Sequence, residues 1–368
     1  MSRNILLFLP LLFIVNYAFS QNIEGVTIDT SLTDLEIDFQ DSVALINKHN
    51  EMIFHSRKKY NYGLDQFNNN NLKDAIISFT NSIVIDSTFS KAYLYRGRCY
   101  DSFDDSLALL DYDLAFSFDS TDFSPLYDIA KIQSVYDINE AINTYNLIIS
   151  LSNQESKAYY EIGVLFYLQE DIQRAVDCFT SSIVLKQDAR ALNDRASCYR
   201  SLDNNELAIK DYILAISLDS TLAFVYNNLA SIYRHQGDSD NALNYYTLAI
   251  TQDPYYALAY NNRGSLYIDL NDIEKALNDI EKAILIQKDY SVAYNNKAVI
   301  YHKKKRYDKA ITYFDIAISL DSDYAKAFLN RGITRQIIRD EEGACSDWMK
   351  ARELGINIAN DYFQNDCN

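Results

Sequence analysis

Alanine returns along the chain at intervals of 33 or 34 residues, each time within a stretch whose apolar positions follow a helical period. A large, mostly aromatic residue follows each alanine by four positions, and a mostly small residue follows it by seven. Offsets of four and seven share one face of an α-helix, so each alanine marks a helix that packs closely against a neighbour. The alanines of this column are Ala75, Ala108, Ala141, Ala175, Ala208, Ala242, Ala276, Ala310 and Ala344.

A second helix is predicted upstream of each of these helices. Twelve residues before most of the alanines a glycine or alanine recurs, as at Gly63, Gly163 and Gly264, and an aromatic often follows it by three. Polar turns such as residues 68–71 join the two helices. Asp-Ser pairs such as Asp219-Ser220 separate the units, where their side chains suit the free amides that open a helix. Each unit is therefore predicted to be a helix, a short turn and a helix.

The units resemble tetratricopeptide repeats, which are 34-residue helical hairpins with small, aromatic and alanine columns, and residues 257–290 are the closest copy. The resemblance extends over residues 56–354. It implies an all-α fold, a right-handed α-α superhelix (a tetratricopeptide solenoid) of about nine helix-turn-helix repeats, with a C-terminal capping helix within residues 355–368.

Three departures from the family pattern are visible. The family proline occurs only as Pro254, and Arg335 replaces the aromatic residue of the last unit. In the third unit Ile129 stands where a small residue belongs, so the first helix of that unit is expected to be bent or shifted.

The N-terminus has the features of an export signal over residues 1–20. Arg3 precedes an unbroken apolar run at residues 5–15, and Ala18 and Ser20 are small residues ahead of a cut at Gln21. The run is too short for a membrane-spanning helix, although a retained anchor is the alternative interpretation. The mature protein is expected to be periplasmic or secreted and to have no further membrane span.

Two further expectations concern the start of the mature chain. The first cysteine is Cys99, so no lipid anchor at the cut site is expected. Residues 21–55 are expected to form a leader that is loose to about Gln40 and helical beyond it.

The composition narrows the classes of function. Lys and Arg number 34 against 51 Asp and Glu, for a net charge of −17, which disfavours nucleic acid as a partner. Either the charge only keeps a convex face solvated, or it favours basic partners. There is no Gly-rich phosphate loop, GxSxG or HExxH motif, and the four histidines are scattered. No catalytic residue, metal site or cofactor is therefore expected.

Five cysteines allow disulfides if the chain is exported. Cys345 and Cys367 are close enough in sequence for a bridge that would hold down the last helix. A Cys178–Cys198 bridge is a second option, and buried cysteines that serve only as small apolar residues are the alternative to both.

The remaining candidate site is a binding surface. The family resemblance implies that the first helices of successive units line a concave groove, and here three of them carry Tyr-Asn-Asn. A side-chain amide both donates and accepts, so a column of asparagines suits an extended peptide backbone, although it also suits contacts between helices. The candidate ligand-binding residues are Asn227, Asn228, Asn261, Asn262, Asn295, Asn296, Asn330, Ser231, Arg234, Ser265, His302 and Lys303.

The sequence therefore predicts a non-enzymatic exported scaffold that binds a protein or extended peptide of unknown identity. A carboxylate clamp is not expected, because Asn, Leu, Val and Ser predominate where Lys and Arg would be needed. Binding of a glycan or envelope polymer is the alternative, since tyrosines stack on sugars and asparagines hydrogen-bond them.

Overall fold

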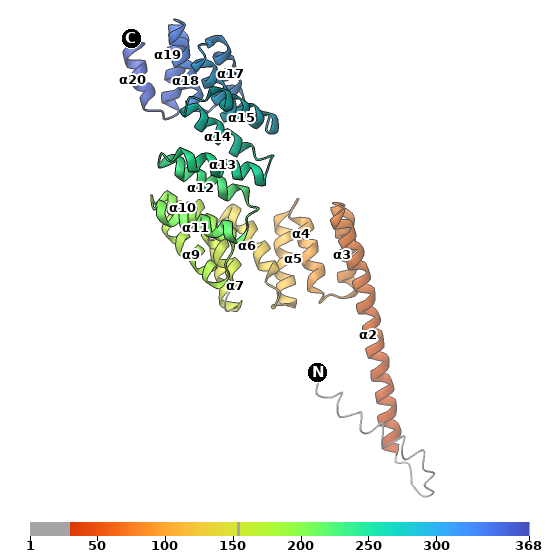
Figure 1. The fold of residues 1–368 in the computed structure, drawn as a ribbon. Helices are drawn as coiled ribbons and strands as arrows, with labels where there is room; N and C mark the ends of the chain where they lie inside the picture. The colour runs from red at the N-terminus through yellow and green to blue at the C-terminus, as the bar shows by residue number, and fades with distance from the viewer. Residues whose placement is uncertain (1–29, 153–154, 368) are drawn as a thin grey trace. The chain divides into compact units, whose positions relative to one another are not determined.

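The computed structural model describes residues 30–152 and 155–367, which form helices α2 to α20 and no strand within those ranges (Figure 1). The expected export signal at residues 1–20 lies outside the described residues. The chain divides into two compact units, Met1–Ile132 and Gln133–Asn368, and the division falls within α6 (Ser124–Tyr136). Within the described part of the chain, every helix is too short or too polar to pass through a bilayer.

Unit one contains two helical hairpins, in which α2 pairs with α3 and α4 with α5. From its sequence the chain is expected to be loose up to about Gln40, and the structure corrects this: α2 is already helical at Thr30. No glycine or proline interrupts the chain between Thr30 and Tyr62, so nothing breaks the helix once it has begun. The helices are α2 (Thr30–Asn68), α3 (Leu72–Ile85), α4 (Ser90–Tyr100) and α5 (Asp105–Phe118).

Unit two is a row of hairpins, each made of a first and a second helix, followed by the short α20. The first helices are α8 (Ser156–Leu168), α10 (Ala189–Ser201), α12 (Ala223–His235), α14 (Ala257–Asp269), α16 (Ser291–Lys303) and α18 (Ala325–Ile337). The second helices are α7 (Ile138–Ser152), which precedes α8, and α9 (Ile172–Leu185), α11 (Asn205–Leu218), α13 (Ser239–Gln252), α15 (Ile273–Ile286), α17 (Tyr307–Leu320) and α19 (Glu341–Glu353).

The repeated columns form the core. All nine column alanines are 0 or 1% exposed, and the aromatic that follows is buried beside them, as at Phe179 and Trp348. The glycine column has a steric cause: a Cβ on Gly332 would lie 2.5 Å from Trp348 Nε1, and one on Gly163 would lie 2.8 Å from the Phe179 ring. The small residue of the first helix therefore makes room for the aromatic of the second.

The third helical repeat, formed by α6 and α7, departs from the other repeats by a shift of its first helix and not by a bend. Its first helix, α6, is helical throughout, and Ala130 is fully buried one position after Ile129. Asp137 alone separates α6 from α7, whereas the other hairpin turns are longer. Ala130, displaced by one residue from the sequence register, is thus the fully buried small side chain of this helix.

Most of the hairpin turns, though not those after α4 and α6, contain a left-handed residue that closes the first helix. In the turn after α16, Lys305 has φ 57°, its N–H bonds the His302 carbonyl at 2.8 Å, and the Arg306 N–H reaches the Tyr301 carbonyl at 2.9 Å. This pair of bonds is the Schellman motif, which favours glycine at the left-handed position. Gly237 occupies that position after α12, but Glu170, Asn271 and Arg339 occupy it elsewhere.

We expect Lys305→Gly to stabilise the protein by about 1 kcal/mol, because glycine has no Cβ penalty at positive φ. The measurement is the midpoint of urea unfolding. Lys304→Gly is the matched control: its φ is −74°, so glycine there only adds chain entropy and lowers the midpoint. Lys305→Ala removes the same charge without relieving the backbone and should not reproduce the gain.

The C-terminal helix α20 (Ile358–Asp366) covers the last hairpin. Its Tyr362 ring stacks on Trp348 with centroids 5.2 Å apart. Cys345 in α19 is disulfide-bonded to Cys367, and their Cα atoms are 5.6 Å apart. Cys99, Cys178 and Cys198 are free thiols, so the second bridge considered from the sequence is absent among the described residues.

Candidate functional site

The first helices of unit two contact one another in order from α8 to α18. The face they share carries one asparagine per helix at Asn228, Asn262, Asn296 and Asn330, and we call this face of α12 to α18 the first-helix surface. A second asparagine precedes the first three of these residues and lies deeper.

Hydrogen bonds between asparagines join each first helix to the one before it. The Nδ2 of the outer asparagine donates to the Oδ1 of the inner asparagine in the preceding unit. The distances are 3.0 Å for Asn228 to Asn193, 3.0 Å for Asn262 to Asn227, 2.9 Å for Asn296 to Asn261, and 3.0 Å for Asn330 to Asn295.

The two asparagine columns therefore have different roles. The inner residues Asn227, Asn261 and Asn295 are 2 or 3% exposed, and their carbonyl oxygens are used in the ladder. The outer residues, such as Asn262, are half-buried at the surface. An amide has two N–H groups and the ladder uses one, so each outer asparagine has one N–H that takes no part in the ladder.

Three further predicted residues also take part in contacts between helices. Ser231 Oγ donates to the Asn227 carbonyl within α12 at 2.9 Å and lies 3.1 Å from the Tyr246 hydroxyl of α13. Arg234 Nη2 donates to Ser265 Oγ at 3.0 Å and to Asp269 at 2.6 Å, so it ties α12 to α14. These contacts fix the spacing of the first helices.

The last two predicted residues, His302 and Lys303, differ in their contacts and exposure. His302 Nδ1 lies 2.9 Å from Thr334 Oγ1, and Thr334 is fully buried. Burial, aided by the Lys303 charge, lowers the pKa of His302, which favours the neutral ring near pH 7. Lys303 itself is exposed at the end of α16.

An apolar row beside the outer asparagines was missed in the sequence. Phe224, Leu258 and Val292 each precede an outer asparagine by four residues, which places them one turn away on the same face. Leu258 is 39% exposed, and the other two are half-buried. The offset of four from the asparagine column was the available signal.

Buried arginine–aspartate pairs were also missed. Arg263 of α14 forms two parallel bonds to Asp279 of α15, at 2.7 and 2.9 Å, and its Nη1 reaches Thr247 of the preceding unit at 2.9 Å. Each pair thus holds a hairpin together and joins it to its neighbour. The others are Arg96–Asp111, Arg195–Asp211 and Arg331–Asp347.

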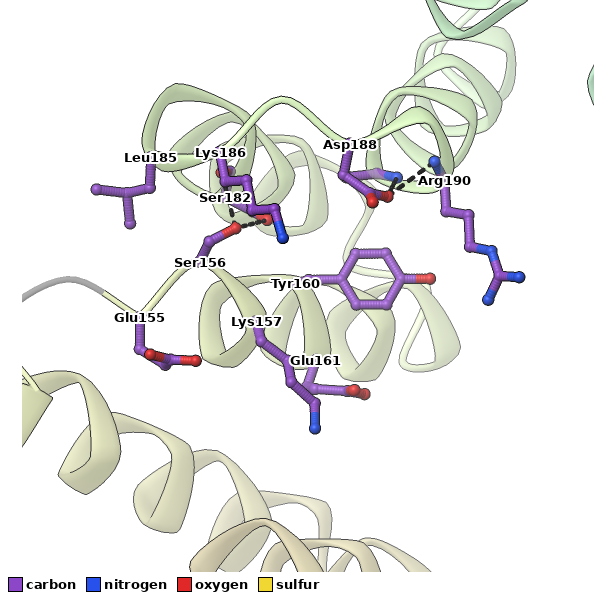
Figure 2. A pocket seen from close by; sticks show the side chains of 11 residues that line it. Glu155, Ser156, Lys157, Tyr160, Glu161, Ser182, Leu185, Lys186, Asp188 and Arg190 are labelled. Atoms are coloured by element: carbon purple, nitrogen blue, oxygen red, sulfur yellow. Dashed lines mark hydrogen bonds between the residues drawn. The ribbon is translucent and has the colours of Figure 1, made fainter. Parts of the chain in front are cut away.

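At α8 and α10 the ladder changes from neutral to charged. Asn193 Nδ2 donates to Asp194 Oδ1 at 2.9 Å, and the Tyr160 hydroxyl donates to Asp194 Oδ2 at 2.8 Å. Tyr160 lies in a pocket between α8, α9 and α10 (Figure 2). Over the described residues, no group of three His, Cys, Asp or Glu side chains is placed to hold a metal ion.

Comparison with known proteins agrees with this architecture. Family models described as tetratricopeptide repeat match residues 189–222, 221–289 and 291–324. A structure titled for the functional characterization of Pseudomonas aeruginosa pilF is 20% identical, with a TM-score of 0.50, over 57% of this chain and 96% of that one. A chain from the APC/C hetero-tetramer Cut9–Hcn1 is 14% identical, with a TM-score of 0.57, over 85% and 76%.

The chain is therefore a tetratricopeptide repeat protein. Its fold is the α-α superhelix that the resemblance to this family implied, and the two structural neighbours share that fold. Proteins of this class are typically interaction scaffolds, which is the level of function that the fold supports.

Proposed function

We propose that this protein is an exported, non-enzymatic scaffold that binds an extended segment of another protein along the first-helix surface. The main support for this proposal is that a row of outer asparagines and a row of apolar side chains lie next to each other on that surface. Each outer asparagine keeps one amide N–H, and one turn away Phe224, Leu258 and Val292 offer apolar contact.

The chemistry of the two rows fits a polypeptide. A peptide backbone in an extended conformation presents carbonyl groups that the free amide N–H groups can bind without reading side chains. The apolar row accepts side chains of the same segment, and its burial supplies most of the binding free energy. The ladder itself holds the asparagines in place before the partner arrives, which lowers the entropy lost on binding.

Export is proposed from the sequence of residues 1–20, and the Cys345–Cys367 bond is consistent with an oxidising compartment. In the protein isolated from its own cells, export predicts a mature N-terminus at Gln21.

We expect Leu258→Arg to reduce capture of the partner about tenfold, because a charge would replace the most exposed apolar contact of the surface. The measurement is affinity capture from an envelope extract of the producing cells, quantified by mass spectrometry. Leu285→Arg is the matched control, since Leu285 is 66% exposed on the second helix α15 and should leave capture intact.

A second variant tests the amides. Asn262→Ala with Asn296→Ala should weaken capture of the same proteins while circular dichroism shows that the helices persist. Equal capture by all variants would refute a partner on this surface. Retention on insoluble wall material with no protein partner would instead favour the glycan interpretation.

A further inference from the structure

A pocket of about 730 Å³ lies between α8, α9 and α10, the helices that precede α12 and its first-helix surface. Figure 2 shows the ring of Tyr160 in its middle, with Glu161 and Lys157 on the same helix and Arg190 and Lys186 opposite. All of these residues belong to unit two. The residues before α10 in this region were not part of the site expected from the sequence.

Glu161 and Asp194 occupy the column that holds the outer asparagines elsewhere. Asn228, Asn262 and Asn296 follow them at the repeat interval, so packing at this position is satisfied by a neutral amide. The two carboxylates are therefore a local departure in charge and not a requirement of the fold.

The Glu161 carboxylate has no hydrogen bond or ion pair among the described residues. Burial raises its pKa, and the nearby charge of Lys157 offsets this only in part. Burial likewise raises the pKa of Asp194, against the hydrogen bonds from Tyr160 and Asn193. A further positive group beside Glu161 would stabilise its ionised form.

The other charges around the pocket nearly cancel. Lys157, Lys186 and Arg190 face Glu155, Glu161 and Asp188. The Asp188 carboxylate is used to cap α10, where it accepts the N–H groups of Arg190 and Ala191. Asp194, bonded to the Tyr160 hydroxyl, adds one more negative charge behind the ring.

We infer that this pocket takes a cationic side chain, arginine or lysine, from the polypeptide on the first-helix surface, with Glu161 as counter-ion and the Tyr160 ring against the cation. This inference rests on the proposed function for the source of the cation. Aromatic rings attract cations, and a carboxylate screened from water pairs with them more strongly than an exposed one. The net charge of −17 also favours the approach of a basic segment.

The test uses three blocked tripeptides, acetyl-Gly-Arg-Gly-amide, acetyl-Gly-Glu-Gly-amide and acetyl-Gly-Gln-Gly-amide. Each is titrated into the isotope-labelled full chain and followed by NMR. We expect the arginine peptide to shift resonances of residues 155–191 and the other two to shift them far less. Because the probes are too short to span the asparagine ladder, this result does not depend on whether the ladder binds a partner.

Two variants of α8 give opposite outcomes. Glu161→Gln, which keeps the shape, should weaken the arginine peptide about three- to tenfold. Lys157→Gln should strengthen it, because it removes a competing cation. Glu274→Gln, an exposed acid on α15, should change nothing. Preference for the glutamate peptide with weakening by Lys157→Gln would assign a carboxylate site instead, and no shift with any peptide would refute a pocket for charged side chains.

Discussion

Replacing Arg263 by alanine should lower the free energy of unfolding by about 3 kcal/mol, which is among the largest effects we expect from a single substitution at a partly buried side chain. The loss of stability comes from the Asp279 carboxylate that the substitution leaves unpaired. The Asp279 side chain is only 4% exposed, and both of its oxygens accept from Arg263, so its charge would stay buried without a partner. The measurement is urea unfolding by circular dichroism, with hydrogen exchange in α14 and α15 to localise the loss.

Arg174→Ala provides the control for this prediction. Arg174 also pairs with an aspartate, Asp171, but the two side chains are 60 and 32% exposed, and such pairs contribute at most about 1 kcal/mol. Removing both partners, as Arg263→Met with Asp279→Leu, should recover most of the stability. If Arg263→Ala costs no more than Arg174→Ala, the pair is not a structural clamp.

The hairpins could be predicted from the sequence because sterics link distant positions. Gly332 must be small because Trp348 fills the adjacent space, and each unit repeats that requirement at a fixed interval. Buried positions that repeat in this way, such as Ala276 and Ile280 one turn later, determine which faces of the helices pack together. The spacing predicted the helical hairpins, and the resemblance to tetratricopeptide repeats implied the fold class.

The roles of neighbouring asparagines could not be predicted in this way. Asn261 and Asn262 are identical and adjacent, yet Asn261 is 3% exposed and Asn262 lies at the surface. Which one faces inward depends on how each first helix is rotated against the next unit, and the residue type does not encode that rotation. The ladder emerges only when successive helices are placed together.

The arginine–aspartate pairs left a signal that comparison of columns could have revealed. Arg263 and Asp279 lie on different helices across a turn, and arginine recurs before the small residue in the same units in which aspartate follows the alanine. For the pocket at Tyr160 the sequence shows only that Glu161 and Asp194 replace asparagine in the outer column, and it does not show the pocket itself. It depends on the path of the chain from α9 into α10, which the repeat pattern does not specify.

The largest change under mild conditions should come from reducing the Cys345–Cys367 bond. The bond closes a loop with a sequence separation of 22, and in the chain-entropy model such a loop contributes about 3 kcal/mol. Without it, α20 has only 9 residues, too few to persist as a helix on its own. Contacts such as the Tyr362 ring on Trp348 would then hold it alone.

Trp348 makes this change directly measurable, because it is the single tryptophan of the chain and is 0% exposed. Reduction with dithiothreitol should release α20, shift the tryptophan emission to longer wavelength and lower the melting temperature. Cys345→Ser with Cys367→Ser should show the shifted emission from the start and no response to reductant, while Cys178→Ser should respond like the original protein. Release of α20 must expose the apolar face of the final hairpin, which a terminal helix normally shields. Unchanged emission and melting temperature after complete reduction would therefore mean that packing against Trp348 holds α20 in place without the disulfide bond.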